Sequence, residues 1–228
     1  MATRTWIIML IAWLVFTISL YLSLRFAGAA SPSRLLDHPN ARSLHQRPIS
    51  RIGGAGRHDH GCVADDGRSY GLSVRTPGFI LAGLAPPALV SFLDDRRGVA
   101  AQRCILVHLL AAVSLLAAGL APSRLLLPGL DLVFPLWAAI PLTLLFTVWM
   151  INLYNFMDGM AGFAGGMAVI GFSTLAWLGR VDAGFSAFCL IVATASAGFL
   201  VHNFPPARIF LGDTGSTALG FLPAAGSL

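Results

Sequence analysis

Lysine and glutamate are absent from this chain of 228 residues: each of its 15 basic residues is Arg and each of its 10 acidic residues is Asp. We interpret this as compositional bias. Charge of either sign is also scarce, at 11% of residues against about 25% in a soluble domain. With 56% hydrophobic residues, the composition excludes an ordinary soluble protein and indicates a membrane protein.

Cysteines are few and scattered. Cys62, Cys104 and Cys189 are an odd number without metal-binding spacing, which excludes a disulfide framework and predicts three free thiols. A basic stripe with interleaved aromatic residues is also lacking, so the net charge of +5 does not indicate a nucleic-acid partner.

Long apolar segments dominate what is present. The first, residues 6–24, holds no charge and is long enough to cross a bilayer, which takes about 20 residues. A cleaved signal peptide ending near Ala27 is the alternative for it. Further candidate spans are 77–93, 104–121, 133–151, 163–179, 183–202 and a segment from Thr217 to the last residue. The sequence therefore predicts an all-α, polytopic transmembrane helix bundle with about six to eight spans and a single membrane domain over 1–228.

The arginines predict the orientation of these spans, because cytoplasmic loops are rich in Arg. Segments 30–58 and 94–103 carry five and three Arg, whereas the connections 122–132 and 180–182 carry one each. The first two are expected inside and the other two outside. Alternation of the spans then places 152–161 and 203–216 on the cytoplasmic side as well.

One stretch, 57–78, breaks this alternation. Two crossings are needed between 30–56 and 94–103, and 79–93 supplies only one. Each Asp or Arg of 57–78 would cost roughly 2.5 to 3.5 kcal/mol at the centre of a bilayer. Its His, Cys and Asp side chains are potential metal ligands but lack zinc-type spacing. We interpret 57–78 as an atypical polar stretch in place of a second span, produced by a locally shifted reading frame or another corruption of the segment; resequencing the gene would test this.

Three polar clusters fall at the predicted cytoplasmic ends of spans, where polar groups are costly unless they face water or a ligand. They are Asp94-Asp95-Arg96-Arg97, the run from Asn152 to Gly159, and Leu211-Gly212-Asp213-Thr214-Gly215-Ser216. Their common side predicts one site assembled at the membrane surface. A small transporter is a competing interpretation, but it would place the acids at mid-membrane depth.

Four blocks in order carry a resemblance to a known family. They are Asp37-His38-Pro39-Asn40-Ala41-Arg42-Ser43-Leu44-His45 with Gly53-Gly54, then Asp94-Asp95, then 152–166, then 210–216. In these blocks the chain resembles the polyprenyl-phosphate N-acetylhexosamine-1-phosphate transferases, which include phospho-N-acetylmuramoyl-pentapeptide transferase and the enzymes that initiate O-antigen.

The resemblance implies an enzyme of the bacterial inner membrane with its active face in the cytoplasm. It would transfer a sugar-1-phosphate from a UDP-N-acetylhexosamine to undecaprenyl phosphate and release UMP, in the first membrane step of surface-glycan, lipopolysaccharide or cell-wall biosynthesis. Both substrates are anionic, so the implied cofactor is Mg²⁺, with Mn²⁺ as an alternative. The implied partners are the two substrates, the bilayer and a second copy of the chain.

The resemblance also assigns roles to residues. Asp213 matches the metal ligand, and Gly212 and Gly215 are expected to expose backbone amides beside it. The catalytic residues are Asp94, Asp95 and Asp158, and the substrate-binding residues are Asn152, Asn155, Asn203, Phe210, Arg42 and His45. Phe210 is expected to stack on uracil.

Structural alternatives remain for several of these residues. Asp94 and Asp95 could form a solvated helix end with their Arg neighbours, and Asp158 could cap a helix. Arg42 and His45 could be anchors on the cytoplasmic side. His108, within an apolar span, is expected to be a hydrogen-bonded packing residue.

Departures from the family pattern support a second hypothesis. Ala161 stands where the family has an Asp, and the family's C-terminal spans and a histidine-containing loop have no counterpart here. The alternative function is therefore an inactive, truncated membrane remnant or a non-catalytic partner of such an enzyme.

Overall fold

The computed structural model describes residues 2–27, 36–37, 49–50, 76–97, 100–122, 124–127 and 130–228. The described helices are α1 (Ala2–Ala27), α2 (Thr76–Arg97), α3 (Ala101–Ala117), α4 (Leu136–Asp158), α5 (Phe163–Leu178), α6 (Ala183–Asn203) and α7 (Gly212–Ser227). The described strands are β1 (Leu36–Asp37), β2 (Ile49–Ser50), β3 (Arg124–Leu127) and β4 (Leu130–Val133). The prediction of an all-α helix bundle is confirmed.

Three described helices are long and apolar enough to cross a membrane: Trp6–Ala27, Leu136–Asp158 and Ala183–Asn203. Two shorter apolar helical segments are Gln102–Ala117 and Phe163–Leu178. Large apolar side chains on their outer faces are exposed, as expected of helices in contact with lipid. Most of the polar stretch 57–78 lies outside the described residues.

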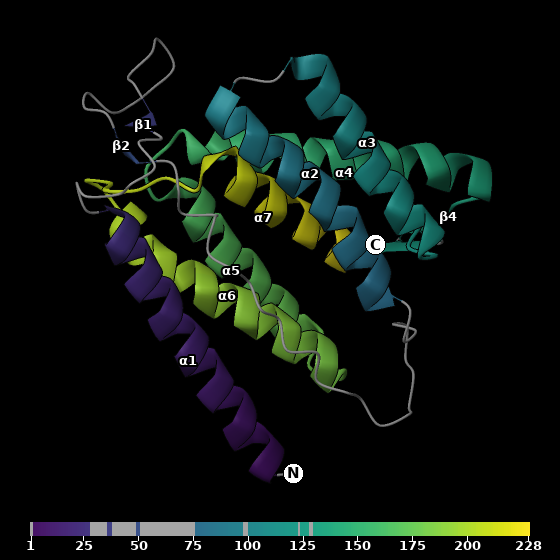
Figure 1. Cartoon of the computed structure of the whole chain (residues 1–228). Coiled ribbons are helices and arrows are strands. Elements are labelled where there is room, and N and C mark those ends of the chain that lie inside the picture. The colour runs from purple at the N-terminus through teal and green to yellow at the C-terminus, as the bar shows by residue number, and fades with distance from the viewer. Residues whose placement is uncertain are drawn as a thin grey trace.

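The helices pack in two groups. One group is α1, α6 and α5, with α6 between the other two; the second is α2, α3, α4 and α7, with α7 in contact with both α2 and α4 (Figure 1). α1 is held on α6 by the Ser19 hydroxyl, which donates to the Ala195 carbonyl over 2.6 Å, and by Ser23, 2.9 Å from Nδ1 of His202. Such hydroxyl contacts hold helices together where the surroundings are apolar.

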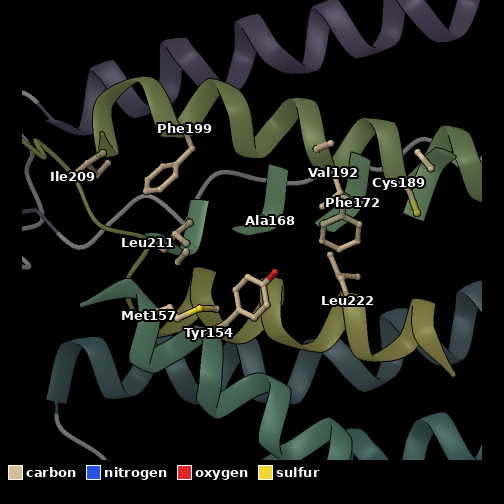
Figure 2. Packing of buried hydrophobic residues seen from close by; sticks show 13 residues of the cluster. Tyr154, Met157, Ala168, Phe172, Cys189, Val192, Phe199, Ile209, Leu211 and Leu222 are labelled. Carbon is tan, nitrogen blue, oxygen red and sulfur yellow. The ribbon is translucent and has the colours of Figure 1, made fainter. Parts of the chain in front are cut away.

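A hydrophobic core joins the two groups. Tyr154 and Met157 of α4 face Phe172 of α5 and Phe199 of α6, with Leu211 beside them (Figure 2). Leu211, which directly precedes α7, belongs to this core, so the core holds the start of α7 against the end of α4.

Two short antiparallel pairs complete the fold. β1 pairs with β2, and β3 with β4 in the register Arg124↔Val133. Nε of Arg124 donates to Oδ1 of Asp131 over 2.6 Å, and this hydrogen bond holds the pKa of the Asp131 carboxyl below its usual value. The sequence predicted only a connection at 122–132.

The two described cysteines are free thiols, as predicted: Cys104 is partly buried and Cys189 is buried. His108 fits the expectation of a packing residue in its burial, while the hydrogen bond expected of it is not seen at one ring nitrogen. The residue is buried, but its Nδ1 has no hydrogen-bond partner within the described part of the chain.

Candidate active site

The start of α7 is bonded to the last residue of α4. The Leu211 amide donates to Oδ1 of Asp158 over 3.1 Å, and the Gly212 amide donates to Oδ2 over 2.8 Å. Asp158 is 7% exposed. Gly212 has φ = 70°, a left-handed conformation that a residue with a side chain rarely adopts. Asp158 therefore accepts two backbone amides at the start of a neighbouring helix, α7.

This arrangement corrects the expectation of exposed amides beside Asp213. Leu211, Gly212 and Gly215 are all buried, and the first two amides are bonded to the carboxylate. The reason is that the four leading N–H groups of a helix lack partners within it, and a neighbouring acid can satisfy them.

The two asparagines before Asp158 lie in different surroundings. α4 continues through the whole motif, so Asn152, Asn155 and Asp158 occupy its last two turns. Residues three apart are separated by about 300° around a helix axis, so each step of three turns the side chain about 60° away from the previous one. Asn152 is accordingly exposed, with its amide on the Val148 carbonyl at 2.7 Å, whereas Oδ1 of Asn155 accepts the Ser216 hydroxyl of α7 at 2.9 Å.

Asn203 links two backbone segments at the same end of the bundle. Its Oδ1 accepts the Gly162 amide over 2.9 Å, and its Nδ2 donates to the Ile209 carbonyl over 2.8 Å. The side chain is 1% exposed. Its amide therefore fixes the turn before α5, which contains Ala161, against the segment that leads to α7. Direct contact with a nucleotide, as the sequence suggested, does not fit this burial.

Phe210 is also enclosed. The residue is 2% exposed, so neighbouring groups cover the ring in this structure. It is not presented as a stacking surface for uracil, contrary to the sequence interpretation. Its chain neighbours Ile209 and Leu211 belong to the core of Figure 2.

Two acidic residues meet around a thiol. The Cys104 thiol at the start of α3 donates to Oδ2 of Asp94 on α2 over 3.7 Å, and Asp213 of α7 also interacts electrostatically with this thiol. Both carboxylate-bearing residues are partly exposed. Helices α2, α3 and α7 thus pack with Asp94 and Asp213 at the same end of the bundle, and the catalytic and metal-binding roles given to these two acids remain predictions.

A buried pair of hydroxyls lies beneath the two acids. Oγ of Ser91 is 2.9 Å from Oγ1 of Thr217, and both residues are buried. Ser91 precedes Asp94 by three residues and Thr217 follows Asp213 by four, so each hydroxyl is one turn from its acid. The sequence reasoning missed this pair, although those spacings were a usable signal; nothing in the sequence pointed to Cys104.

Other predicted site residues are not placed. The side chain of Asp95 is outside the described part of the structure, although its backbone belongs to α2, and Arg42 and His45 lie wholly outside the described residues. Their predicted roles remain predictions.

The described residues contain no group of three or more His, Cys, Asp or Glu side chains that could hold a metal ion. A site with two carboxylates nevertheless fits Mg²⁺, which is usually held by one or two carboxylates together with water and substrate phosphates. Oxygen ligands also suit this cation better than the thiol of Cys104 does. The residues present are compatible with a cation shared with a bound phosphate.

The fold and the site define a membrane helix bundle with paired carboxylates at one end. Comparison with known sequences gives the family: residues 78–228 match the model of glycosyl transferase family 4. The chain belongs to this family.

Curated relatives agree with this membership. Over 82% of its length, the chain is 35% identical to the probable undecaprenyl-phosphate N-acetylglucosaminyl 1-phosphate transferase of Bacillus subtilis, covering 52% of that protein. Over 83% it is 32% identical to the decaprenyl-phosphate N-acetylglucosaminephosphotransferase of Mycobacterium leprae, covering 53%. Over 60% it is 34% identical to the phospho-N-acetylmuramoyl-pentapeptide-transferase of Bacillus cytotoxicus, covering 47%. The chain spans about half the length of these relatives.

Proposed function

We propose that this protein transfers a sugar-1-phosphate of the N-acetylhexosamine type from a UDP-sugar to undecaprenyl phosphate and releases UMP. The observation that carries the proposal is that α2 and α7 are joined by the buried Ser91–Thr217 hydroxyl pair, one turn from Asp94 and from Asp213, at one end of the bundle. The names of the relatives support a polyprenyl-phosphate acceptor and an amino-sugar phosphate as the transferred group.

The proposed reaction is a phosphoryl transfer. An oxygen of the lipid phosphate attacks the sugar-bearing phosphorus of the donor, the bond from that phosphorus to the bridging oxygen breaks, and UMP leaves with this oxygen. A cation at the site supplies charge neutralisation between the anionic substrates. Asp213 and Asp94 are the residues that would hold it. Asp94, the first of the adjacent pair, would also orient or deprotonate the lipid phosphate, and the exposed Asn152, with Arg42 and His45, would contact the donor.

The same proposal gives the location of the reaction. The Arg-rich segment 94–103 joins α2 to α3, so the carboxylates at that end of α2 would face the cytoplasm of a bacterium. The product would enter surface-glycan, lipopolysaccharide or cell-wall synthesis, and the chain would act as a homodimer.

A non-catalytic role is the second candidate, and one observation favours it. Ala161, in the turn after α4, replaces an acid of the family pattern with a methyl group. A chain without turnover could still bind lipid phosphate or a sister protein through the remaining acids.

The deciding experiment measures UMP release by the purified chain from UDP-N-acetylglucosamine and UDP-N-acetylgalactosamine, with undecaprenyl phosphate and Mg²⁺. We expect turnover that EDTA removes and Mg²⁺ restores. Asp213→Asn is expected to lower turnover by about 100-fold or more, because a cation contributes several kcal/mol to stabilising the transferring group.

The matched control is Asp182→Asn. Asp182 caps α6 through the Gly184 and Phe185 amides, at the end of α6 away from Asn203. It should leave turnover within about twofold, since distant sites act independently. Full activity of Asp213→Asn would refute the metal assignment. If neither the unmodified chain nor Ala161→Asp releases UMP, the result would favour the non-catalytic role.

A further inference from the structure

The geometry around Asp158 indicates a structural role and not proton transfer. Both of its oxygens accept backbone amides of the segment that begins α7, and the carboxylate is buried. An ionised carboxylate is purely an acceptor, whereas protonation turns one oxygen into a donor. Taking up a proton would therefore leave a neutral carboxyl, which is a weaker acceptor for the Leu211 and Gly212 amides than the carboxylate. A general base at this position would weaken the contacts that hold the start of α7 each time it took up a proton.

The consequence of these bonds lies one residue further on. Gly212 is followed directly by Asp213, which stands in the first turn of α7. A buried anion at a helix start is favoured by the helix dipole as well as by its hydrogen bonds. The bonds that hold the Leu211 and Gly212 amides in place therefore also fix the backbone position from which the Asp213 side chain extends.

We propose that Asp158 is a positioning residue, which fixes the start of α7 from the end of α4 and so keeps Asp213 opposite Asp94 and Cys104. Asn155, through Ser216, adds a second tie between the same two helices one turn deeper. This inference rests on the proposed function for its significance in catalysis, but the placement of α7 can be measured without any turnover.

The thiol of Cys104 reports on this placement, because it donates to Asp94 of α2, and α2 is joined to α7 by the hydrogen bond between Ser91 and Thr217. In a background with Cys62→Ser and Cys189→Ala, Cys104 is the remaining cysteine of the chain. The rate of its reaction with N-ethylmaleimide is measured on the full chain in membranes. Asp158→Ala is expected to raise this rate about tenfold, since losing hydrogen bonds to a charged group frees the helix start by at least that factor. Asp158→Asn, which keeps one acceptor oxygen, should give a smaller rise.

Asp182→Ala is the matched control, because Asp182 is also an Asp that accepts two backbone amides at a helix start. It removes the same kind of cap from α6 and should leave the Cys104 rate unchanged. An unchanged rate in Asp158→Ala, or an equal rise in Asp182→Ala, overturns the proposal. If Asp158→Ala fails to accumulate, Asp158→Asn decides by the same comparison.

The pH dependence of turnover separates positioning from acid–base catalysis in an active chain. Asp158→Asn is expected to lower kcat while the curve of kcat against pH keeps its shape and midpoints. Loss of one limb of that curve would show that Asp158 itself titrates in the reaction and would overturn the proposal. If the chain has no turnover, the function proposed above fails, and the labelling rates still test the placement of α7.

Discussion

Two buried threonine hydroxyls on α4 differ in whether they make a hydrogen bond, and this difference bears on the stability of the protein. Thr143 and Thr147 lie one turn apart on α4, and both are 0% exposed. The Thr143 hydroxyl donates to the Ala139 carbonyl over 2.9 Å, whereas Oγ1 of Thr147 finds no partner among the described residues. A buried polar atom without a partner is destabilising, and its replacement by an apolar group of the same shape is favourable.

Thr147→Val is therefore expected to stabilise the protein by about 1 kcal/mol, which is the scale of an unsatisfied hydroxyl. The matched variant Thr143→Val removes a made hydrogen bond and should be neutral or destabilising by a similar amount. Thermal unfolding of both variants in the same detergent measures the difference. A lower midpoint for Thr147→Val than for Thr143→Val would contradict the prediction.

At the residue scale, the sequence predicted which polar groups lie near one another but not the hydrogen-bond partner of each side chain. The acids Asp94 and Asp213 were expected together, and the helices that carry them are joined one turn away by the Ser91–Thr217 pair. The roles given to Asn203 and Phe210 do not fit their burial, because a motif fixes the residue type while tertiary packing decides whether the side chain faces outward. Asp158 shows the same limit: spacing places it at a helix end, and only the fold brings the start of α7 against it.

At the element scale, α7 depends on a close approach to α4. A Cβ atom added at Gly220 would lie 2.6 Å from Cα of Ile151 and 2.7 Å from the Met150 carbonyl oxygen, so the backbones would have to separate. Small residues allow such contacts between membrane helices. We expect Gly220→Ala to destabilise the protein by about 1–3 kcal/mol, the scale of overpacking a tight interior.

Gly166→Ala on α5 provides the comparison, because a Cβ there would meet nothing within 4 Å. Removing a glycine from a helix interior is favourable by roughly 0.5–1 kcal/mol, so this variant should be neutral or more stable. Both midpoints come from the same thermal unfolding experiment. A destabilisation of equal size in the two variants would show that helix propensity, and not the α4–α7 contact, governs Gly220.

Hydrophobicity predicted each described helix, because apolar length is a strong signal in a membrane protein. Boundaries were less accurate: the predicted span ended at residue 151, whereas α4 continues to Asp158. The polar residues from Asn152 on predict that the span ends there. The helical hydrogen bonds nevertheless continue to Asp158, because neighbouring segments provide hydrogen-bond partners for the polar side chains. The β3–β4 pair was missed, although Pro128-Gly129 between two apolar runs is a turn signal.

For the whole molecule, orientation in the membrane decides whether the paired acids can meet a cytoplasmic nucleotide sugar. α6 provides the test, because its 21 residues would span about 30 Å, the thickness of the hydrocarbon layer. Val181 lies just before α6 and is 96% exposed, whereas the exposed Arg208 lies after it, close to the site. The two positions therefore belong on opposite sides of the bilayer.

In a chain whose three native cysteines are replaced, we expect Val181→Cys to react with a membrane-impermeant maleimide in intact cells. Arg208→Cys is expected to react only after the membrane is permeabilised, because the Arg-rich loops hold that end of the bundle in the cytoplasm. The reverse pattern would place the acids outside, away from any nucleotide-sugar pool, and would remove the donor from the proposed reaction. Reaction of both variants in intact cells would show instead that α6 does not separate the two ends of the bundle.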